Sequence, residues 1–134
     1  MADLQIIIPL TGNGSRFKAE GYKRLKPFIK IHGLPMINWV AKMFPGDEKK
    51  ILFICRDEHI RKYNYILPAL KAITSSPKIH RIENWIKKGP ANDIIQAAED
   101  IDDNKPVLVS YCDFFALWDY AGFKKIISNI NPDG

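Results

Sequence analysis

An apolar run that leads into a glycine-containing turn is the feature that most limits how this chain of 134 residues can fold. The run from Leu4 to Ile8 predicts a buried first strand. Shortly after it, Gly12 and Gly14 let the backbone turn sharply without a Cβ in the way. Backbone N–H groups exposed in such a turn form a concavity that binds anions. The sequence therefore predicts a strand that opens into an anion-binding turn.

The segment that follows this turn is strongly basic. It contains only one acid, Glu20, against six cationic residues: Arg16, Lys18, Lys23, Arg24, Lys26 and Lys30. Arg16 places a planar and permanently charged guanidinium beside the glycine turn. A strand followed by a glycine turn and a basic loop is a suitable place to hold phosphate groups.

The rest of the chain alternates between strand-like and helix-like patterns. Short β-rich apolar runs predict further strands at 50–55, 78–82 and 106–111. Helical spacing of apolar residues predicts helices at 36–44, from 58 to about 67 and at 120–130, with another helical turn near 70–76. The second of these helices is expected to stop near Pro68. A further helix is expected to begin from a cap at Asn92 or Asp93. This order indicates an α/β fold with a mostly parallel, Rossmann-like sheet flanked by helices.

Three segments with candidate binding residues follow predicted strands, and ligands of such sheets bind outside the carboxyl ends of the strands. The segments are Gly12–Arg16, the turn at Gly89-Pro90, and Asp113. Each also has an ordinary explanation. A Gly-Pro pair is commonly just a turn, and an acid after a strand commonly caps the next turn. Together they could face one crevice.

Composition narrows the remaining classes of protein. The length suits one domain, and no apolar run approaches the roughly 18 residues of a membrane span. The N-terminus lacks the pattern of a signal peptide, so we expect a cytoplasmic protein. The net charge of +5 leaves a nucleic-acid-binding domain as an alternative, although no recognised nucleic-acid module is present. A basic pocket for a triphosphate accounts for the same charges.

The motifs resemble those of a known family. Three of them occur in order: Gly12-Asn13-Gly14-Ser15-Arg16-Phe17, then Lys26-Pro27, then Gly33-Leu34-Pro35-Met36-Ile37. Together they are similar to the N-terminal signature of the sugar nucleotidyltransferases, and the spelling is nearest to members that make capsule and surface-polysaccharide precursors. The dinucleotide fingerprint fits less well because Phe17 stands where its third glycine belongs, and no P-loop lysine follows the first glycine.

The resemblance implies a reaction and a set of site residues. Members transfer a nucleotidyl group from a nucleoside triphosphate to a sugar 1-phosphate, or a related phosphorylated alcohol, and release pyrophosphate. It implies catalytic roles for Arg16 and Lys26, and Mg²⁺ as a cofactor held by Asp113. It implies nucleotide contacts from Leu10, Thr11, Gly12, Asn13, Gly14, Ser15, Gly89, Pro90 and Ala91. Pro90 departs from the family, which carries Gly-Thr-Ala or a similar turn there.

Family members continue well beyond the length of this chain. The resemblance therefore implies that residues 1–134 form a single, apparently truncated α/β nucleotide-binding domain of the nucleotide-diphospho-sugar transferase type, without the C-terminal part that binds the acceptor. A non-catalytic nucleotide-binding module or an inactive fragment is the alternative. The uncovered sheet would favour self-association, which makes a homo-oligomer possible. The motifs do not distinguish the nucleobase or the acceptor.

Overall fold

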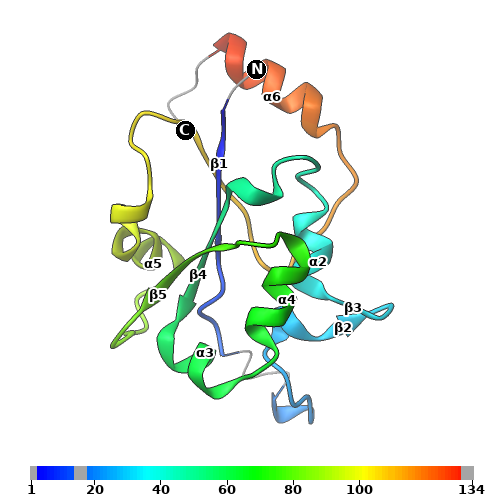
Figure 1. Ribbon diagram of the computed structural model, residues 1–134, viewed down its shortest axis with the longest axis vertical. Helices are drawn as coiled ribbons and strands as arrows, with labels where there is room; N and C mark the ends of the chain where they lie inside the picture. The colour runs from blue at the N-terminus through cyan, green and yellow to red at the C-terminus, as the bar shows by residue number, and fades with distance from the viewer. Residues whose placement is uncertain (1–2, 14–17, 131–134) are drawn as a thin grey trace.

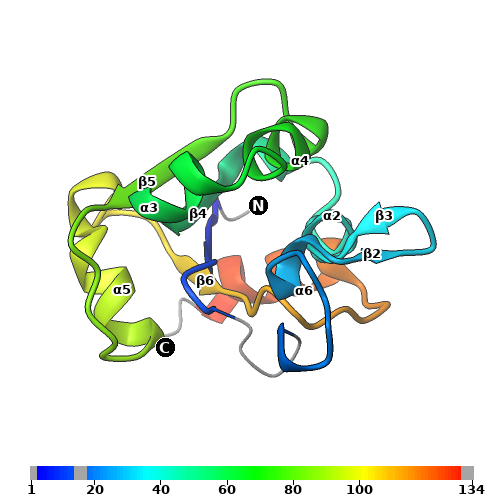
Figure 2. The same cartoon turned by 90° about the horizontal axis from the view of Figure 1, so that it is seen from below.

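A four-stranded parallel sheet forms the centre of the molecule in the computed structural model, which describes residues 3–13 and 18–130 (Figure 1). The strand order is β5-β4-β1-β6, and every pairing between neighbours is parallel. Helices cover both faces of the sheet, with α5 on one face and α2, α4 and α6 on the other (Figure 2). The predicted α/β class is confirmed.

The described elements follow one another in the predicted strand–helix alternation. The sheet strands are β1 (Gln5–Pro9), β4 (Ile51–Arg56), β5 (Lys78–Ile82) and β6 (Val107–Val109). A separate hairpin pairs β2 (Lys30–Ile31) with β3 (Leu34–Pro35). The helices are α2 (Met36–Ala41), α3 (Asp57–Lys62), α4 (Ile66–Ile73), α5 (Pro90–Gln96) and α6 (Tyr120–Ile130). Short 3₁₀ turns lie at η1 (Lys26–Phe28), η2 (Glu48–Lys50) and η3 (Ala98–Asp100).

Strand β1 is buried on both faces, which explains its continuous apolar sequence. Ile6, Ile7 and Ile8 are completely inaccessible to solvent. Because successive side chains of a strand point to opposite faces, Ile6 and Ile8 enter the larger core beneath α2 and α4, whereas Ile7 enters the smaller core beneath α5. A one-residue shift of this strand would exchange the two cores, so the burial sets its register.

A tight hairpin connects the basic segment to α2. Ile31 pairs with Leu34 across a two-residue turn in which His32 has φ 51° and Gly33 has φ 78°. Positive φ at both central residues is typical of the turn that matches the twist of two antiparallel strands. Gly33 takes this conformation without a Cβ penalty, which accounts for the glycine in the Gly33-Leu34-Pro35 motif.

Several predicted helix boundaries are wrong. The helix expected from residue 58 to about 67 ends earlier, at Lys62 in α3. Helix α4 begins at Ile66 and includes part of the helical turn expected near 70–76, so Pro68 lies inside its first turn instead of ending a helix. A proline is tolerated there because the N–H groups of a first helical turn have no partner within the helix. Helix α2 is also shorter than expected, and Pro35 lies in β3 just before it instead of in its first turn.

Strand β6 is at the edge of the described sheet and is only partly buried. We expected a buried strand over 106–111, but β6 is three residues long, and Val107 and Val109 are 44% and 55% exposed. Both lie on the face that α5 covers elsewhere, while Leu108 packs against the larger core.

Within residues 3–13 and 18–130, no helix is long and apolar enough to cross a membrane.

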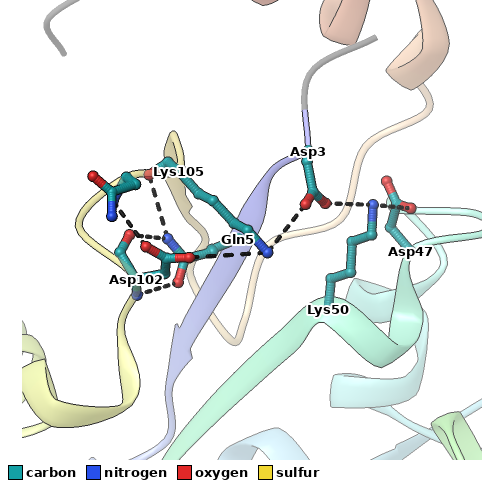
Figure 3. Close-up of polar contacts among 7 residues, drawn as sticks. Asp3, Gln5, Asp47, Lys50, Asp102 and Lys105 are labelled. Carbon is teal, nitrogen blue, oxygen red and sulfur yellow. Dashed lines mark hydrogen bonds and ion pairs between the residues drawn. The ribbon is translucent and has the colours of Figure 1, made fainter.

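Ion pairs join the strands at the amino end of the sheet (Figure 3). Asp3 contacts both Lys50 Nζ, at 2.9 Å, and Lys105 Nζ, at 3.1 Å. Lys50 continues to Asp47, whose buried carboxylate also accepts hydrogen bonds from the Tyr120 hydroxyl at 2.6 Å and from Lys124 Nζ at 2.9 Å. Hydrogen bonds from Lys50 and Lys105 lower the pKa of Asp3 to about 2. The network links β1, β4 and α6.

Asp47→Asn should therefore destabilise the protein. Burial by itself would raise the pKa of Asp47, but the Tyr120 and Lys124 hydrogen bonds and the lysine charges outweigh it and lower the pKa. Hydrogen bonds to charged groups contribute about 1.5–3 kcal/mol each, so we expect a loss of this order in the free energy of unfolding by urea at pH 7. Asp103→Asn, at an exposed aspartate, is the control and should change it by less than about 0.5 kcal/mol.

The same substitution should change how stability depends on pH. A carboxylate with a lowered folded pKa stabilises the protein above its unfolded value near 3.8, and this contribution is lost as the pH falls through the folded value. Urea titrations between pH 5 and pH 2 should therefore show a shallower loss for Asp47→Asn than for the wild type. Parallel curves would show that Asp47 does not carry the acid sensitivity.

Candidate functional site

The carboxyl ends of β1 and β6 define the place in the sheet where a ligand is expected. From β1 the chain proceeds to β4 and β5 on one side and then returns to β6 on the other side of β1. In open α/β sheets, ligands bind at such a switch in strand order, outside the carboxyl ends of the strands. The segments that leave β1 and β6 there begin at Leu10 and Ser110.

The segment after β1 remains attached to the sheet before it becomes exposed. Leu10 is buried in the core, and its N–H donates to the Ile54 carbonyl at 2.7 Å. This residue therefore packs in the core at the point where the chain leaves β1 for the predicted site. Thr11 is also buried, whereas Gly12 and Asn13 are exposed. Gly12 does not adopt a positive φ, and a Cβ built on it would meet no atom of residues 3–13 and 18–130 within 4 Å. The described part of the chain therefore does not by itself require glycine there.

Two buried charged side chains hold Thr11. Arg56, at the carboxyl end of β4, donates from Nε to the Thr11 carbonyl oxygen at 2.6 Å. The Thr11 hydroxyl donates to Asp93 Oδ2 at 2.5 Å. Arg56 and Asp93 are only 6% and 1% exposed. Because charge-assisted hydrogen bonds are the stronger ones, Thr11 is held firmly at both its backbone and its side chain.

His59 on α3 contacts the next part of the same segment. Its Nε2 lies 3.3 Å from Asn13 Oδ1. Burial, followed by the charge of Arg56, lowers the pKa of His59 to about 4, so the imidazole is neutral at pH 7. The buried Nδ1 has no hydrogen-bond partner among the described residues. In the tautomer with the proton on Nε2, the neutral ring donates to Asn13 Oδ1 and orients that side chain.

The predicted catalytic lysine and the predicted metal ligand contact each other. Lys26 Nζ lies 2.8 Å from Asp113 Oδ2, although 87 residues separate the two in sequence. Both side chains are about one-third exposed, so the pair is accessible from solvent. Lys26 starts the η1 turn after the basic loop, and Asp113 lies four residues after β6. The fold brings these two predicted residues together.

Two further cations of the basic segment, Lys18 and Arg24, contact tyrosine side chains. Lys18 Nζ donates to the Tyr63 hydroxyl at 3.3 Å, and the Arg24 guanidinium lies 4.8 Å from the centre of the Tyr65 ring. The Tyr65 hydroxyl also accepts from the Leu25 N–H at 2.9 Å. These contacts fasten the segment to the connection between α3 and α4. Part of the positive charge therefore packs on tyrosine rings instead of facing a phosphate site.

The predicted turn at Gly89-Pro90-Ala91 is exposed at the start of α5. Gly89 has φ 91°, a conformation that favours glycine, and Pro90 is the first helical residue. The expected side-chain cap from Asn92 or Asp93 is wrong, since Gly89 is the N-cap residue. Asp93 lies in the first turn and accepts instead from Thr11 and from Trp85 Nε1, at 2.9 Å. This contact ties the start of α5 to the segment after β1.

The remaining predicted site residues cannot be placed in this way. Gly14, Ser15 and Arg16 lie outside the described residues. For Mg²⁺, the described donor set at the site is the single carboxylate of Asp113. Magnesium commonly binds one or two carboxylates together with substrate phosphates and water, so Asp113 fits a metal that arrives with a nucleotide.

Sequence reasoning missed Arg56, His59, Trp85 and Asp93 as parts of the site. In the sequence, Arg56 only precedes a predicted helix, and Asn92 or Asp93 is predicted only to cap its own helix. The rule that singled out Asp113, a charged residue at the carboxyl end of a buried strand, applies equally to Arg56. No sequence signal identified the partner of Asp93.

Comparison with known proteins indicates the fold. No family model matches the sequence, and no curated protein sequence matches it. Among solved structures, one described as a glucose-1-phosphate thymidylyltransferase from Bacillus anthracis matches with a TM-score of 0.73 and 21% identity over 94% of this chain and 50% of that one. A UDP-glucose pyrophosphorylase matches with a TM-score of 0.66 and 15% identity over 98% of this chain and 55% of that one.

A third solved structure agrees with these two. A nucleoside-diphosphate-sugar pyrophosphorylase from Vibrio cholerae matches with a TM-score of 0.64 and 20% identity, over 89% of this chain and 52% of that one. This chain therefore spans about half the length of the solved structures it matches. The expected resemblance is confirmed at the level of fold: residues 3–13 and 18–130 have the Rossmann-like fold found in sugar nucleotidyltransferases.

Proposed function

We propose that this chain forms the donor-binding part of a nucleotidyltransferase that acts on a nucleoside triphosphate and a sugar 1-phosphate or related phosphorylated alcohol. The observation that carries the proposal is the contact between Lys26 and Asp113 at the switch in strand order. Two residues selected for a phosphate site and its metal, far apart in sequence, lie within 2.8 Å of each other. The similarity in fold supports the reaction class.

In the proposed reaction, an acceptor phosphate oxygen attacks the α-phosphorus of the triphosphate in line. A new phosphorus–oxygen bond forms, and the bond to the β-phosphate breaks to release pyrophosphate. The protein has little covalent chemistry to perform, so its contribution is positioning and charge stabilisation. Lys26 neutralises charge on the reacting phosphate, and Arg16 binds the leaving β- and γ-phosphates. Surface-polysaccharide precursor synthesis is the proposed context.

Backbone groups of the two loops complete the donor site. In the proposed complex, residues 10–15 contact the phosphates, and residues 89–91 contact the nucleobase. Pro90 offers no N–H, so any backbone hydrogen bond to the base has to come from its neighbours. Asp113 would hold Mg²⁺, which supplies charge neutralisation between donor and acceptor phosphates. Lys26 contacts the same carboxylate, so a metal held by Asp113 would lie close to the lysine that faces the phosphates.

Magnesium with the cognate nucleoside triphosphate should raise the melting temperature. A ligand at 100 times its dissociation constant stabilises the folded state by about 2.7 kcal/mol, which corresponds to a shift of several degrees. Melting curves with ATP, CTP, GTP and UTP, each with and without Mg²⁺, check this. Asp113→Asn should remove the magnesium-dependent part, while Asp103→Asn should retain it. Absence of a shift with all four nucleotides would contradict the proposed site.

Lys26→Ala should weaken nucleotide binding without much effect on folding. The ion pair is partly exposed, so its loss should change stability by only about 0.2–1 kcal/mol. Loss of a charged hydrogen-bond donor to phosphate should weaken binding by roughly 10- to 100-fold. Calorimetric titration measures the affinity. Lys78→Ala, at an exposed lysine at the start of β5, is the matched control. A large fall in melting temperature with unchanged affinity would make Lys26 structural.

The 134-residue chain should bind the donor but not turn it over. Because it spans about half the length of the matched structures, we propose that the acceptor-binding part lies outside these residues. Correct placement of donor and acceptor can contribute about 7–11 kcal/mol of the barrier. Pyrophosphate release should therefore stay at background with Mg²⁺, each triphosphate and a panel of sugar 1-phosphates. Turnover that disappears in Lys26→Ala would show that these residues form a complete enzyme.

A further inference from the structure

We infer that Arg56, Trp85 and Asp93 form a clamp around Thr11 that positions the two proposed nucleotide-binding loops relative to each other. This inference rests on the proposed function and assigns positioning roles to Arg56 at the end of β4, Trp85 in the loop after β5 and Asp93 in α5. The loops are the segment after β1 and the segment from β5 to the start of α5. In sequence they are more than 70 residues apart.

Four contacts close the clamp into a ring. Arg56 Nε donates to the Thr11 carbonyl oxygen at 2.6 Å, and the Thr11 hydroxyl donates to Asp93 Oδ2 at 2.5 Å. Trp85 Nε1 donates to the second oxygen of Asp93, Oδ1, at 2.9 Å. The Arg56 guanidinium carbon lies 3.3 Å from the centre of the Trp85 ring, which completes the ring of contacts. Both oxygens of Asp93 are therefore occupied by donors from different loops.

Burial makes these contacts strong and makes the loss of any one of them costly. A charged group away from water is costly unless it is paired or hydrogen-bonded, and both Arg56 and Asp93 are buried. Thr11 lies between them and meets the cation with its carbonyl and the anion with its hydroxyl. If one contact is lost, a buried charge loses a partner. The ring should therefore behave as one unit and not as four independent contacts.

The ring has a direct consequence for a ligand that touches both loops. A nucleoside triphosphate bound as proposed has its phosphates at the segment after β1 and its base at residues 89–91. If the clamp already fixes the distance between the loops, little conformational freedom is lost on binding. If the clamp is loosened, a ligand that spans both loops should lose affinity, whereas one that contacts only the phosphate loop should lose much less.

Trp85→Phe is the most informative variant. It keeps an aromatic ring for Arg56 to stack on and removes the N–H that donates to Asp93, together with part of the indole ring, a loss that the control variant shares. Trp118→Phe is the matched control, because Trp118 Nε1 also donates a hydrogen bond, to the Met43 carbonyl at 2.8 Å, and its ring packs on Tyr120. Tyr120 belongs to the Asp47 network at the amino end of the sheet, away from the two loops.

The first experiment tests the ring in the free protein with a double-mutant cycle. Thr11→Val and Trp85→Phe are measured singly and together by urea unfolding. Thr11 and Trp85 meet through Asp93, so the effect of the double variant on the unfolding constant should differ at least threefold from the product of the single effects. Thr11→Val with Trp118→Phe should show simple multiplication. Multiplication in both pairs would overturn the clamp, whatever the protein binds.

The second experiment tests whether the ring positions the loops for a ligand. Calorimetric affinities are measured for each of the four nucleoside triphosphates and for inorganic tripolyphosphate, all with Mg²⁺. In Trp85→Phe, the cognate nucleotide should weaken about tenfold while tripolyphosphate changes less than about twofold. Trp118→Phe should change neither. Equal loss for both ligands would make the ring purely structural and overturn its positioning role.

The two experiments separate this inference from the proposed function. If the wild type binds none of the four nucleotides, the proposed function fails and the positioning role fails with it, while the cycle still decides whether the ring exists. If the wild type binds a nucleotide and Trp85→Phe binds it equally well, only the clamp fails. A coupled cycle together with a selective loss of nucleotide affinity supports both.

Discussion

The structure depends on the burial of β1 from both faces and its hydrogen bonding from both edges. Ile6 to Ile8 occupy the two cores, while β4 and β6 pair with β1 on either side. A strand in this position cannot move without disturbing two cores and two ladders of hydrogen bonds. Its carboxyl end is consequently a rigid point from which the segment at Thr11 emerges. Because the strand order reverses beside β1, this rigid point is also where sheets of this kind bind their ligands.

The two ends of the sheet use charge differently. At the amino end, Asp3, Lys50, Asp47 and Lys124 pair with one another and link strands to α6, which satisfies their charges within the protein. At the carboxyl end, the charges lie in two layers. Arg56 and Asp93 are buried beneath the loop and hold it, whereas Lys26 and Asp113 are partly exposed above the sheet. The buried layer holds the loop in place, and the exposed layer remains accessible to solvent.

The neutral state of His59 fits this division. A protonated imidazole would place a further positive charge next to Arg56 in a buried position, and the lowered pKa of His59 avoids this at neutral pH. The ring can then act as a hydrogen-bond donor to Asn13 without adding charge.

The edge strand β6 differs from the buried β1. Val107 and Val109 are exposed, because nothing in the described part of the chain covers that side of β6.

The sequence by itself determined the α/β class and the order of its elements, and it indicated three candidate segments that follow strands. These follow from periodicity and from the shared direction of parallel strands, both of which are local properties. It also indicated Lys26 and Asp113, but only by resemblance and strand position. The tertiary structure decided that these two meet, that Pro68 lies within a helix, and that Asp93 binds Thr11 instead of capping α5. Contacts between residues more than 80 positions apart depend on how the layers pack, and no local pattern encodes that packing.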